Sequence, residues 1–279
     1  MFRILSGIPR DRRSSGHRIA SPVALPLVLL LTASALGNGG TNGLRAAPSQ
    51  VLYLTQSAGF AHPVLAHSEG IMRRIGAESE RFDVTVSHDA STLTALALDR
   101  YDAVVFYTTG ELPMNDAQKA ALLAYVRGGG GFVGVHSATD TFYEWPGYLA
   151  LIGGYFDGHP WRQEVAVNVE DQDHPSTRHL GASFRIDDEI YQFRDWSRSG
   201  VHVLLSLDVA SVDMAASGIN RTDSDFALAW TRSEGSGRVF YTALGHRPEV
   251  WDDARYQRHL IEGMTWAMGN GGTPFAGLR

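Results

Sequence analysis

Short apolar runs rich in β-branched and aromatic residues recur through the first half of the chain beyond residue 50. They occupy residues 51–55, 82–88, 102–108 and 131–136, and segments with helical spacing of apolar positions separate them. Strands that alternate with helices in this way are typical of a parallel sheet. The pattern therefore predicts an α/β fold in which helices cover both faces of a parallel sheet.

One helix is marked at both ends. Asn115 can cap its start, an apolar stripe follows at helical spacing, and Gly128 can end it. The glycine run 128–131 is then a helix stop and a tight turn. It precedes a strand instead of opening a helix, so it is a poor candidate for a phosphate cradle.

The pattern changes after residue 147. Residues 163–170, 201–207, 226–231 and 238–244 look like strands joined by loops, and a helix over 253–268 closes the fold. No linker, internal repeat or low-complexity tract interrupts residues 50–270. We therefore expect a single domain over 47–279.

The first 46 residues have a different character. Several arginines, among them Arg12 and Arg13, precede the apolar run 22–36, and small residues follow it. This order is typical of a signal peptide, and the run is shorter than the roughly 18 to 20 apolar residues that a spanning helix needs. We expect 1–46 to be a signal peptide and leader, with a mature start between Gly37 and Pro48. The mature protein would be exported, periplasmic or secreted, without a membrane span; the export route stays open.

Composition excludes several kinds of chemistry. The chain has no cysteine, which removes disulfides, thiolate zinc sites and cysteine nucleophiles. Lys119 is the single lysine and lies in the predicted surface helix, which argues against Schiff-base chemistry and a P-loop. The formal charge of −6 becomes −11 without residues 1–46, which hold six arginines and one aspartate. Nucleic acid is therefore not an expected partner.

Polar residues follow the ends of the predicted parallel strands. His62 follows the first strand, Glu111 the third, His136 and Asp140 the fourth, and His246 the strand at 238–244. Ligands of open α/β sheets bind beyond the carboxyl ends of such strands. We expect these groups to converge on one rim, with His136 close to His246.

Four motifs resemble one family. They are VGVHSATDTFYEWPGY, LIGGYFDGHPWRQEV, EDQDHPSTRHL and GRVFYTALGHRPE, and together they look like the ThuA-like family, named for trehalose utilisation. The resemblance covers roughly residues 50–270. It implies the flavodoxin-like fold of class I glutamine amidotransferases and a role in sugar metabolism.

The same comparison excludes amide transfer. Amidotransferases of this fold place a cysteine in a G-x-C-x-G turn, whereas here His136 stands between Gly134 and Ala138. The sequence HRPE at 246–249 resembles their His-Pro-Glu pair with one residue inserted. Ser137 follows one position too late for a nucleophile elbow, so a serine hydrolase is a minor alternative.

The candidate catalytic residues are imidazoles and carboxylates. His136 and His246 form the expected central pair, and each can serve as a metal ligand, a proton carrier or a hydrogen-bonding group for a hydroxyl. Asp140 can orient an imidazole or act as a base, or simply cap a following helix. Glu189 resembles a motif residue of the family, and Glu249 can hold His246 in one tautomer or cap a helix.

A divalent metal such as zinc is a further possibility. Its expected ligands are His62, His136, His159 and His246, although no local spacing specifies such a site. Alternatively, the same histidines bond a sugar directly and shuttle protons. Rings and polar groups in the same loops suit a sugar, whose apolar face stacks while its hydroxyls bond. The candidate substrate-binding residues are Glu111, Ser137, Tyr143, Trp145, Trp161 and Tyr191, although most aromatic residues of a chain belong to its core.

The sequence thus favours an exported enzyme that acts on a carbohydrate or keto-sugar derivative by histidine and carboxylate acid–base chemistry. Assistance by a metal ion stays open. Isomerisation, epimerisation and hydrolysis all stay open. The alternative from another class is a non-catalytic carbohydrate-binding module, and a scaffold protein is a third. The oligomeric state is not predicted.

Overall fold

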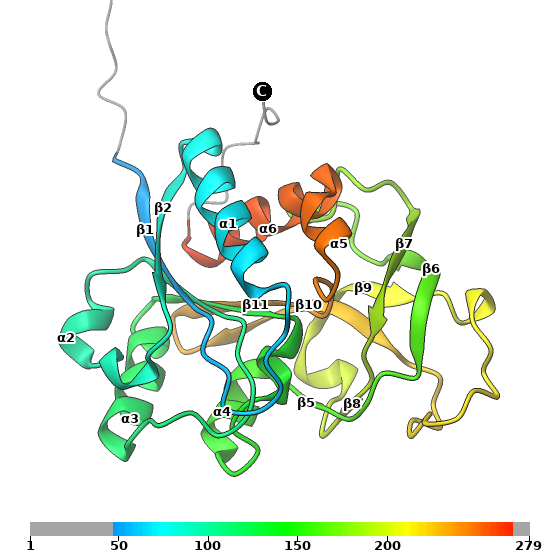
Figure 1. The fold of residues 1–279 in the computed structure, drawn as a ribbon, viewed down its shortest axis with the longest axis horizontal. Coiled ribbons are helices and arrows are strands. Elements are labelled where there is room, and N and C mark those ends of the chain that lie inside the picture. Colours follow the sequence, from blue (N-terminus) through cyan, green and yellow to red (C-terminus); the bar gives the residue numbers. More distant parts are fainter. Residues whose placement is uncertain (1–46, 270–279) are drawn as a thin grey trace, which may run out of the picture. The chain divides into compact units, whose positions relative to one another are not determined.

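The structure, a computed structural model, describes residues 47–269 and contains a nine-stranded sheet (Figure 1). The strand order is β2-β1-β3-β4-β11-β10-β9-β6-β7. The first five strands in this order are parallel to one another: β2 (Phe82–Ser87), β1 (Ser49–Leu54), β3 (Ala103–Phe106), β4 (Gly131–Val135) and β11 (Gly237–Thr242). This confirms the predicted parallel core, which has the flavodoxin-like order.

The helices lie in two layers. Figure 1 shows α1 (Leu65–Ser79), α5 (Pro248–Asp252) and α6 (Ala254–Ala267) on one face of the parallel strands, and α2 (Ala95–Leu98), α3 (Asp116–Arg127) and α4 (Pro146–Ile152) on the other. Every residue of β3 and β4 is buried, as expected of strands covered on both faces. The predicted α/β class with helices on both faces is confirmed.

The remaining four strands make the sheet mixed. Beyond β11, the strands β10 (Ala227–Glu234), β9 (His202–Leu207), β6 (Trp161–Val169) and β7 (Ser183–Ile190) are each antiparallel to their neighbours. A separate two-stranded sheet pairs β5 (Tyr155–Phe156) with β8 (Phe193–Arg194). Four 3₁₀ helices complete the fold: η1 (Ala90–Thr92), η2 (His136–Asp140), η3 (Arg198–Gly200) and η4 (Val209–Ser211).

Local signals position α3 and β4 as predicted. The Asn115 side chain accepts a hydrogen bond from the Gln118 backbone N–H, the Gln118 side-chain oxygen accepts one from the Asn115 backbone N–H, and Gly128 caps the other end. In β4, a Cβ on Gly134 would lie 2.6 Å from Ile152 Cδ1 and 2.9 Å from the Tyr241 ring, so any other residue would force these side chains to shift. None of the helices within residues 47–269 is long and apolar enough to cross a membrane. The predicted signal peptide lies outside the described residues.

Candidate functional site

Four side chains converge at the carboxyl ends of the parallel strands. His136 follows β4 directly and His246 follows the neighbouring β11, which brings His136 Nε2 within 3.2 Å of His246 Nδ1. The ring of His62, from the loop after β1, lies 5.0 Å from that of His136 and 5.3 Å from that of His246. Glu189 enters from β7, and its Oε2 lies 3.5 Å from His136 Nε2 and 3.2 Å from His246 Nδ1. We call these four residues the rim cluster.

His136 is held in one orientation. Its φ of 45° lies in the left-handed region, a conformation that costs about 1 to 3 kcal/mol for a non-glycine residue and is frequent at functional sites. The Tyr241 hydroxyl donates to its carbonyl at 2.7 Å, and the Tyr191 ring lies 4.2 Å from its own. Its Nδ1 donates to the Ala243 carbonyl at 2.6 Å. In the neutral imidazole the lone pair is therefore on Nε2, which faces His246 and Glu189.

His246 is positioned through its backbone by a residue that the sequence did not single out. The fully buried Asp188 carboxylate accepts hydrogen bonds from the backbone N–H groups of Gly245, His246 and Arg247 at 2.7, 3.1 and 3.2 Å. The feature of the sequence that could have indicated Asp188 is the run of three acidic residues at 187–189, near the end of β7. Asp188 thus fixes the turn that carries His246, whereas Glu189 contacts its ring.

The pKa values of Glu189 and His62 are shifted by their surroundings in the rim cluster. Burial would raise the pKa of the Glu189 carboxyl, but hydrogen bonds and charge from His136 and His246 outweigh it and lower that pKa below its ordinary value. The second oxygen of Glu189 is 2.6 Å from Arg162 Nη2. Burial, together with the neighbouring histidines, lowers the pKa of His62 to about 3, so His62 is neutral over the physiological range.

A cavity of about 460 Å³ adjoins the rim cluster. Its size falls within the range of small-molecule sites. It is lined by Pro63, Val64, Arg162, Glu189, His246, Arg247, Pro248 and Glu249. Glu189 and His246 therefore belong both to the buried cluster and to the cavity wall. Glu249 is exposed in the first turn of α5, and the carboxylate at His246 Nδ1 is that of Glu189.

Two other predicted residues lie next to the cluster without joining it. His159 Nε2 is 3.6 Å from Glu189 Oε1 and 3.2 Å from Arg162 Nη2. The group whose donor atoms lie within 4.8 Å of one another is His62, His136, Glu189 and His246, so Glu189 takes the place that the sequence suggested for His159. Asp140 accepts a hydrogen bond from the Tyr143 hydroxyl at 2.6 Å, and burial raises the pKa of its carboxyl. It ends η2, so its interpretation as a helix cap was wrong.

The remaining predicted substrate-binding residues are scattered. Glu111 is exposed and accepts a hydrogen bond from the Glu144 backbone at 3.1 Å, away from the cavity lining. Ser137 is fully buried, with no hydrogen-bond partner for its hydroxyl within residues 47–269. Trp161 packs against Phe226 in the core, and Trp145 packs against Phe142 at the start of α4. Tyr191 alone stacks directly on a residue of the cluster, His136.

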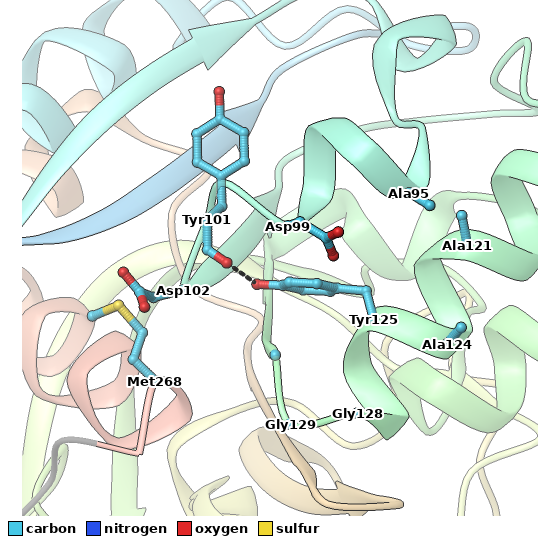
Figure 2. A pocket seen from close by; sticks show the side chains of 11 residues that line it. Ala95, Asp99, Tyr101, Asp102, Ala121, Ala124, Tyr125, Gly128, Gly129 and Met268 are labelled. Atoms are coloured by element: carbon cyan, nitrogen blue, oxygen red, sulfur yellow. Dashed lines mark hydrogen bonds between the residues drawn. The ribbon is translucent and has the colours of Figure 1, made fainter.

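A second cavity, of about 480 Å³, lies at the opposite ends of the strands (Figure 2). Its wall includes Tyr101 and Asp102 just before β3, the glycines 128–130 just before β4, and Met268. Tyr125 crosses it and donates a hydrogen bond to the Tyr101 carbonyl at 3.1 Å. No histidine lines this cavity, in contrast to the cavity beside the rim cluster, whose wall includes His246.

Fold and site together define an α/β protein of the class I glutamine amidotransferase-like type, in which His136 follows β4 at the carboxyl ends of the parallel strands. The chain belongs to the ThuA family, described as trehalose utilisation, whose model matches residues 50–267.

Solved structures agree with this assignment. A putative ThuA-like protein from Bacteroides uniformis is 26% identical with a TM-score of 0.68, over 83% of this chain and 95% of its own. A putative ThuA-like protein from Parabacteroides merdae is 22% identical with a TM-score of 0.63, over 79% of this chain and 90% of its own. The latter likeness shows the fold alone. No curated protein matches the chain.

Proposed function

We propose that this chain is an enzyme that acts on a carbohydrate or keto-sugar derivative in the 460 Å³ cavity, with the rim cluster as its reactive centre. One observation carries the proposal: Glu189 and His246 are at once members of the buried cluster and part of the cavity wall. A substrate in the cavity therefore contacts a buried carboxyl whose pKa is lowered by its histidine neighbours, and perturbed pKa values are common in catalytic sites. The family's link to trehalose utilisation supports a sugar as the substrate class.

The charges of the cavity wall favour an uncharged substrate. Two arginines line it, and each faces a carboxylate: Arg162 lies 2.6 Å from Glu189, and Arg247 lies 3.5 Å from Asp187. Glu249 adds a further negative charge to the wall. An anionic substrate would have to compete for the arginines, whereas sugar hydroxyls can bond both to the carboxylates and to the guanidinium groups.

The groups present suit proton transfer next to a sugar carbonyl or hydroxyl. Such a step needs a group that stabilises developing negative charge on oxygen and a group that exchanges the proton. His246 and Arg162, which line the cavity, can supply the first by donating hydrogen bonds to that oxygen. His159, whose side chain is 36% exposed and lies beside Glu189, can exchange a proton with solvent. Isomerisation, epimerisation and hydrolysis share this requirement, and the products distinguish them.

The test is turnover by the purified full-length chain on a panel of disaccharides and their keto forms, with products followed by mass spectrometry. Glu189→Gln keeps the shape of the side chain and removes its charge. We expect it to lower turnover by about 100-fold or more, the lower end for loss of a group that supports charge in the transition state, because Glu189 contacts both Arg162 and His246. The matched control is Glu164→Gln on the neighbouring strand, because Glu164 is exposed and pairs only with Arg185 at the surface.

The outcomes decide between the two classes of protein. Product formation that is lost in Glu189→Gln and retained in Glu164→Gln supports the enzyme. Sugar binding by the wild-type chain without any product from the panel would instead support a carbohydrate-binding module and refute the proposal.

We also propose that the protein works after export, from the arginine-rich segment and apolar run within residues 1–46. N-terminal sequencing of the protein recovered outside the cytoplasm should give a start between Gly37 and Pro48. A start at Met1 in that material would contradict cleavage.

A further inference from the structure

Three donor atoms of the rim cluster form a nearly equilateral triangle. Its edges are 3.2 Å from His136 Nε2 to His246 Nδ1, 3.5 Å from His136 Nε2 to Glu189 Oε2, and 3.2 Å from His246 Nδ1 to Glu189 Oε2. Ligands at about 2.0 to 2.2 Å from a tetrahedral ion lie roughly 3.3 to 3.6 Å from each other. One ion can therefore occupy this triangle with little movement of the side chains.

His62 supplies a fourth donor on the same side. The three imidazole rings lie 5.0, 5.3 and 5.2 Å apart, and rings bound tetrahedrally to one ion would be about 5 Å apart. One ring nitrogen of His62 lies within 4.8 Å of the donor atoms of His136, Glu189 and His246. His62 can therefore complete a four-ligand set with the three atoms of the triangle.

Residues around the four side chains orient their donor atoms, as hydrogen bonds to metal ligands do in known metal sites. The hydrogen bond from His136 Nδ1 to the Ala243 carbonyl leaves the Nε2 lone pair directed at the triangle. Arg162 binds Oε1 of Glu189, so Oε2 is left to face the histidines. The three backbone bonds of Asp188 hold the turn that carries His246.

We infer that His62, His136, Glu189 and His246 bind a single divalent transition metal ion of the zinc type. Three imidazoles and one carboxylate suit zinc and its neighbours, whereas calcium and magnesium prefer oxygen donors. The ligand set differs from the four histidines expected from the sequence, because Glu189 is a ligand and His159 is not. The inference deepens the proposed function: an ion at this place would polarise a sugar oxygen in the cavity, whose wall includes two of its ligands.

The first experiment measures the metal itself. The purified full-length chain is dialysed against Zn²⁺, then against metal-free buffer, and its zinc is counted by elemental analysis. We expect one ion per chain, and a visible absorption spectrum when Co²⁺ replaces zinc. A folded wild-type protein that retains neither Zn²⁺ nor Co²⁺ would overturn the inference.

Variants then test the ligand set. Glu189→Gln and His136→Ala should each weaken zinc binding at least tenfold, and circular dichroism checks that they fold. The control His202→Ala removes an exposed histidine that pairs with Asp171 at 2.8 Å, and it should bind zinc as the wild type does. Equal binding by Glu189→Gln and the wild type, or equal loss in His202→Ala, would refute the site.

Arg162, which contacts Glu189, gives an independent check of the metal site. Arg162→Gln should weaken zinc binding about 10- to 100-fold, the range for loss of an outer-shell partner. Arg185→Gln is the matched control, since Arg185 pairs with the exposed Glu164 on the same pair of strands. Zinc binding that is identical in both variants would show that Arg162 does not position Glu189.

Failure of the metal site and failure of the proposed function give different results. Failure of the folded wild type to retain zinc, with turnover of a sugar that chelator does not affect, would refute the metal site and leave the enzyme. Tight zinc binding at the four residues without turnover of any sugar would leave the site and remove the proposed function.

Discussion

The turn that carries His246 depends on one buried carboxylate, which makes Asp188→Asn an informative change. Asp188 Oδ2 accepts from the Gly245 N–H at 2.7 Å, and Oδ1 accepts from the N–H groups of His246 and Arg247 at 3.1 and 3.2 Å. Asparagine has one carbonyl oxygen and one amino group. It can retain the two bonds at Oδ1, but it places an N–H donor against the Gly245 N–H.

The expected loss of stability follows from these three bonds. Leaving one buried N–H unsatisfied costs about 1 to 3 kcal/mol, and turning two charged hydrogen bonds into neutral ones costs about 1 kcal/mol each. Burial raises the pKa of the Asp188 carboxyl, so removing its charge regains part of the desolvation penalty. We expect the free energy of unfolding to fall by about 2 to 4 kcal/mol, or the melting temperature by roughly 5 to 15 °C.

Two assays separate a structural role from a positioning role. Urea or thermal melts give the change in stability, and zinc titration well below the melting temperature shows whether the folded variant still presents His246. The control Asp187→Asn removes a neighbouring exposed carboxylate that lies 3.5 Å from Arg247, and it should change stability by less than about 1 kcal/mol. If Asp188→Asn melts like Asp187→Asn, the accounting of the three bonds is wrong. If Asp188→Asn has a lower melting temperature than the wild type yet binds zinc as tightly, Asp188 does not position His246.

Three further predictions concern the buried His259, the packing around Gly134 and the bound metal. Burial lowers the pKa of His259 to about 3, so between about pH 6.5 and pH 3 the unfolded chain binds a proton that the folded chain does not. The free energy of unfolding should therefore drop by about 2 kcal/mol more in the wild type than in His259→Gln from pH 7 to pH 5, measured by urea melts; equal drops would contradict this. Gly134→Ala places a Cβ 2.6 Å from Ile152 and should destabilise the fold by about 1 to 3 kcal/mol, whereas Gly70→Ala, whose Cβ meets nothing within 4 Å, should not. Chelator should lower the melting temperature of zinc-loaded wild type and leave that of Glu189→Gln unchanged, because a bound ion stabilises only a chain that holds it.

Much of the fold follows from local features of the chain. The apolar runs at 51–55, 82–88, 102–108 and 131–136 correspond to β1 to β4, and the capping signals of Asn115 and Gly128 correspond to the ends of α3. Strands buried on both faces must be continuously apolar, so their pattern is visible without knowledge of their neighbours. The proximity of His136 and His246 was also predictable, because both directly follow strands of the parallel core.

β7 was not predicted from the sequence, because its residues are too polar for a typical strand. Its residues SFRIDDEI include four charged side chains, which is unusual for a strand. β7 lies at the edge of the sheet, where one side has no strand partner, and its two buried carboxylates are bonded within the site. These two carboxylates can be buried because groups from other elements bond to them, and the sequence of β7 alone does not show those groups.

The sequence by itself determined the parallel core, the family motifs and the pair His136 and His246, because each depends on local pattern or on the direction of adjacent strands. Only the tertiary structure decided which carboxylate meets that pair. Glu249 is near His246 in sequence, yet Glu189 makes the contact, from a strand four places beyond β11 in the sheet. The order in which the antiparallel strands pair, which places β7 at the rim, has no signal in local hydrophobic periodicity. Contacts of this kind are set by strand order and by the packing of the whole sheet.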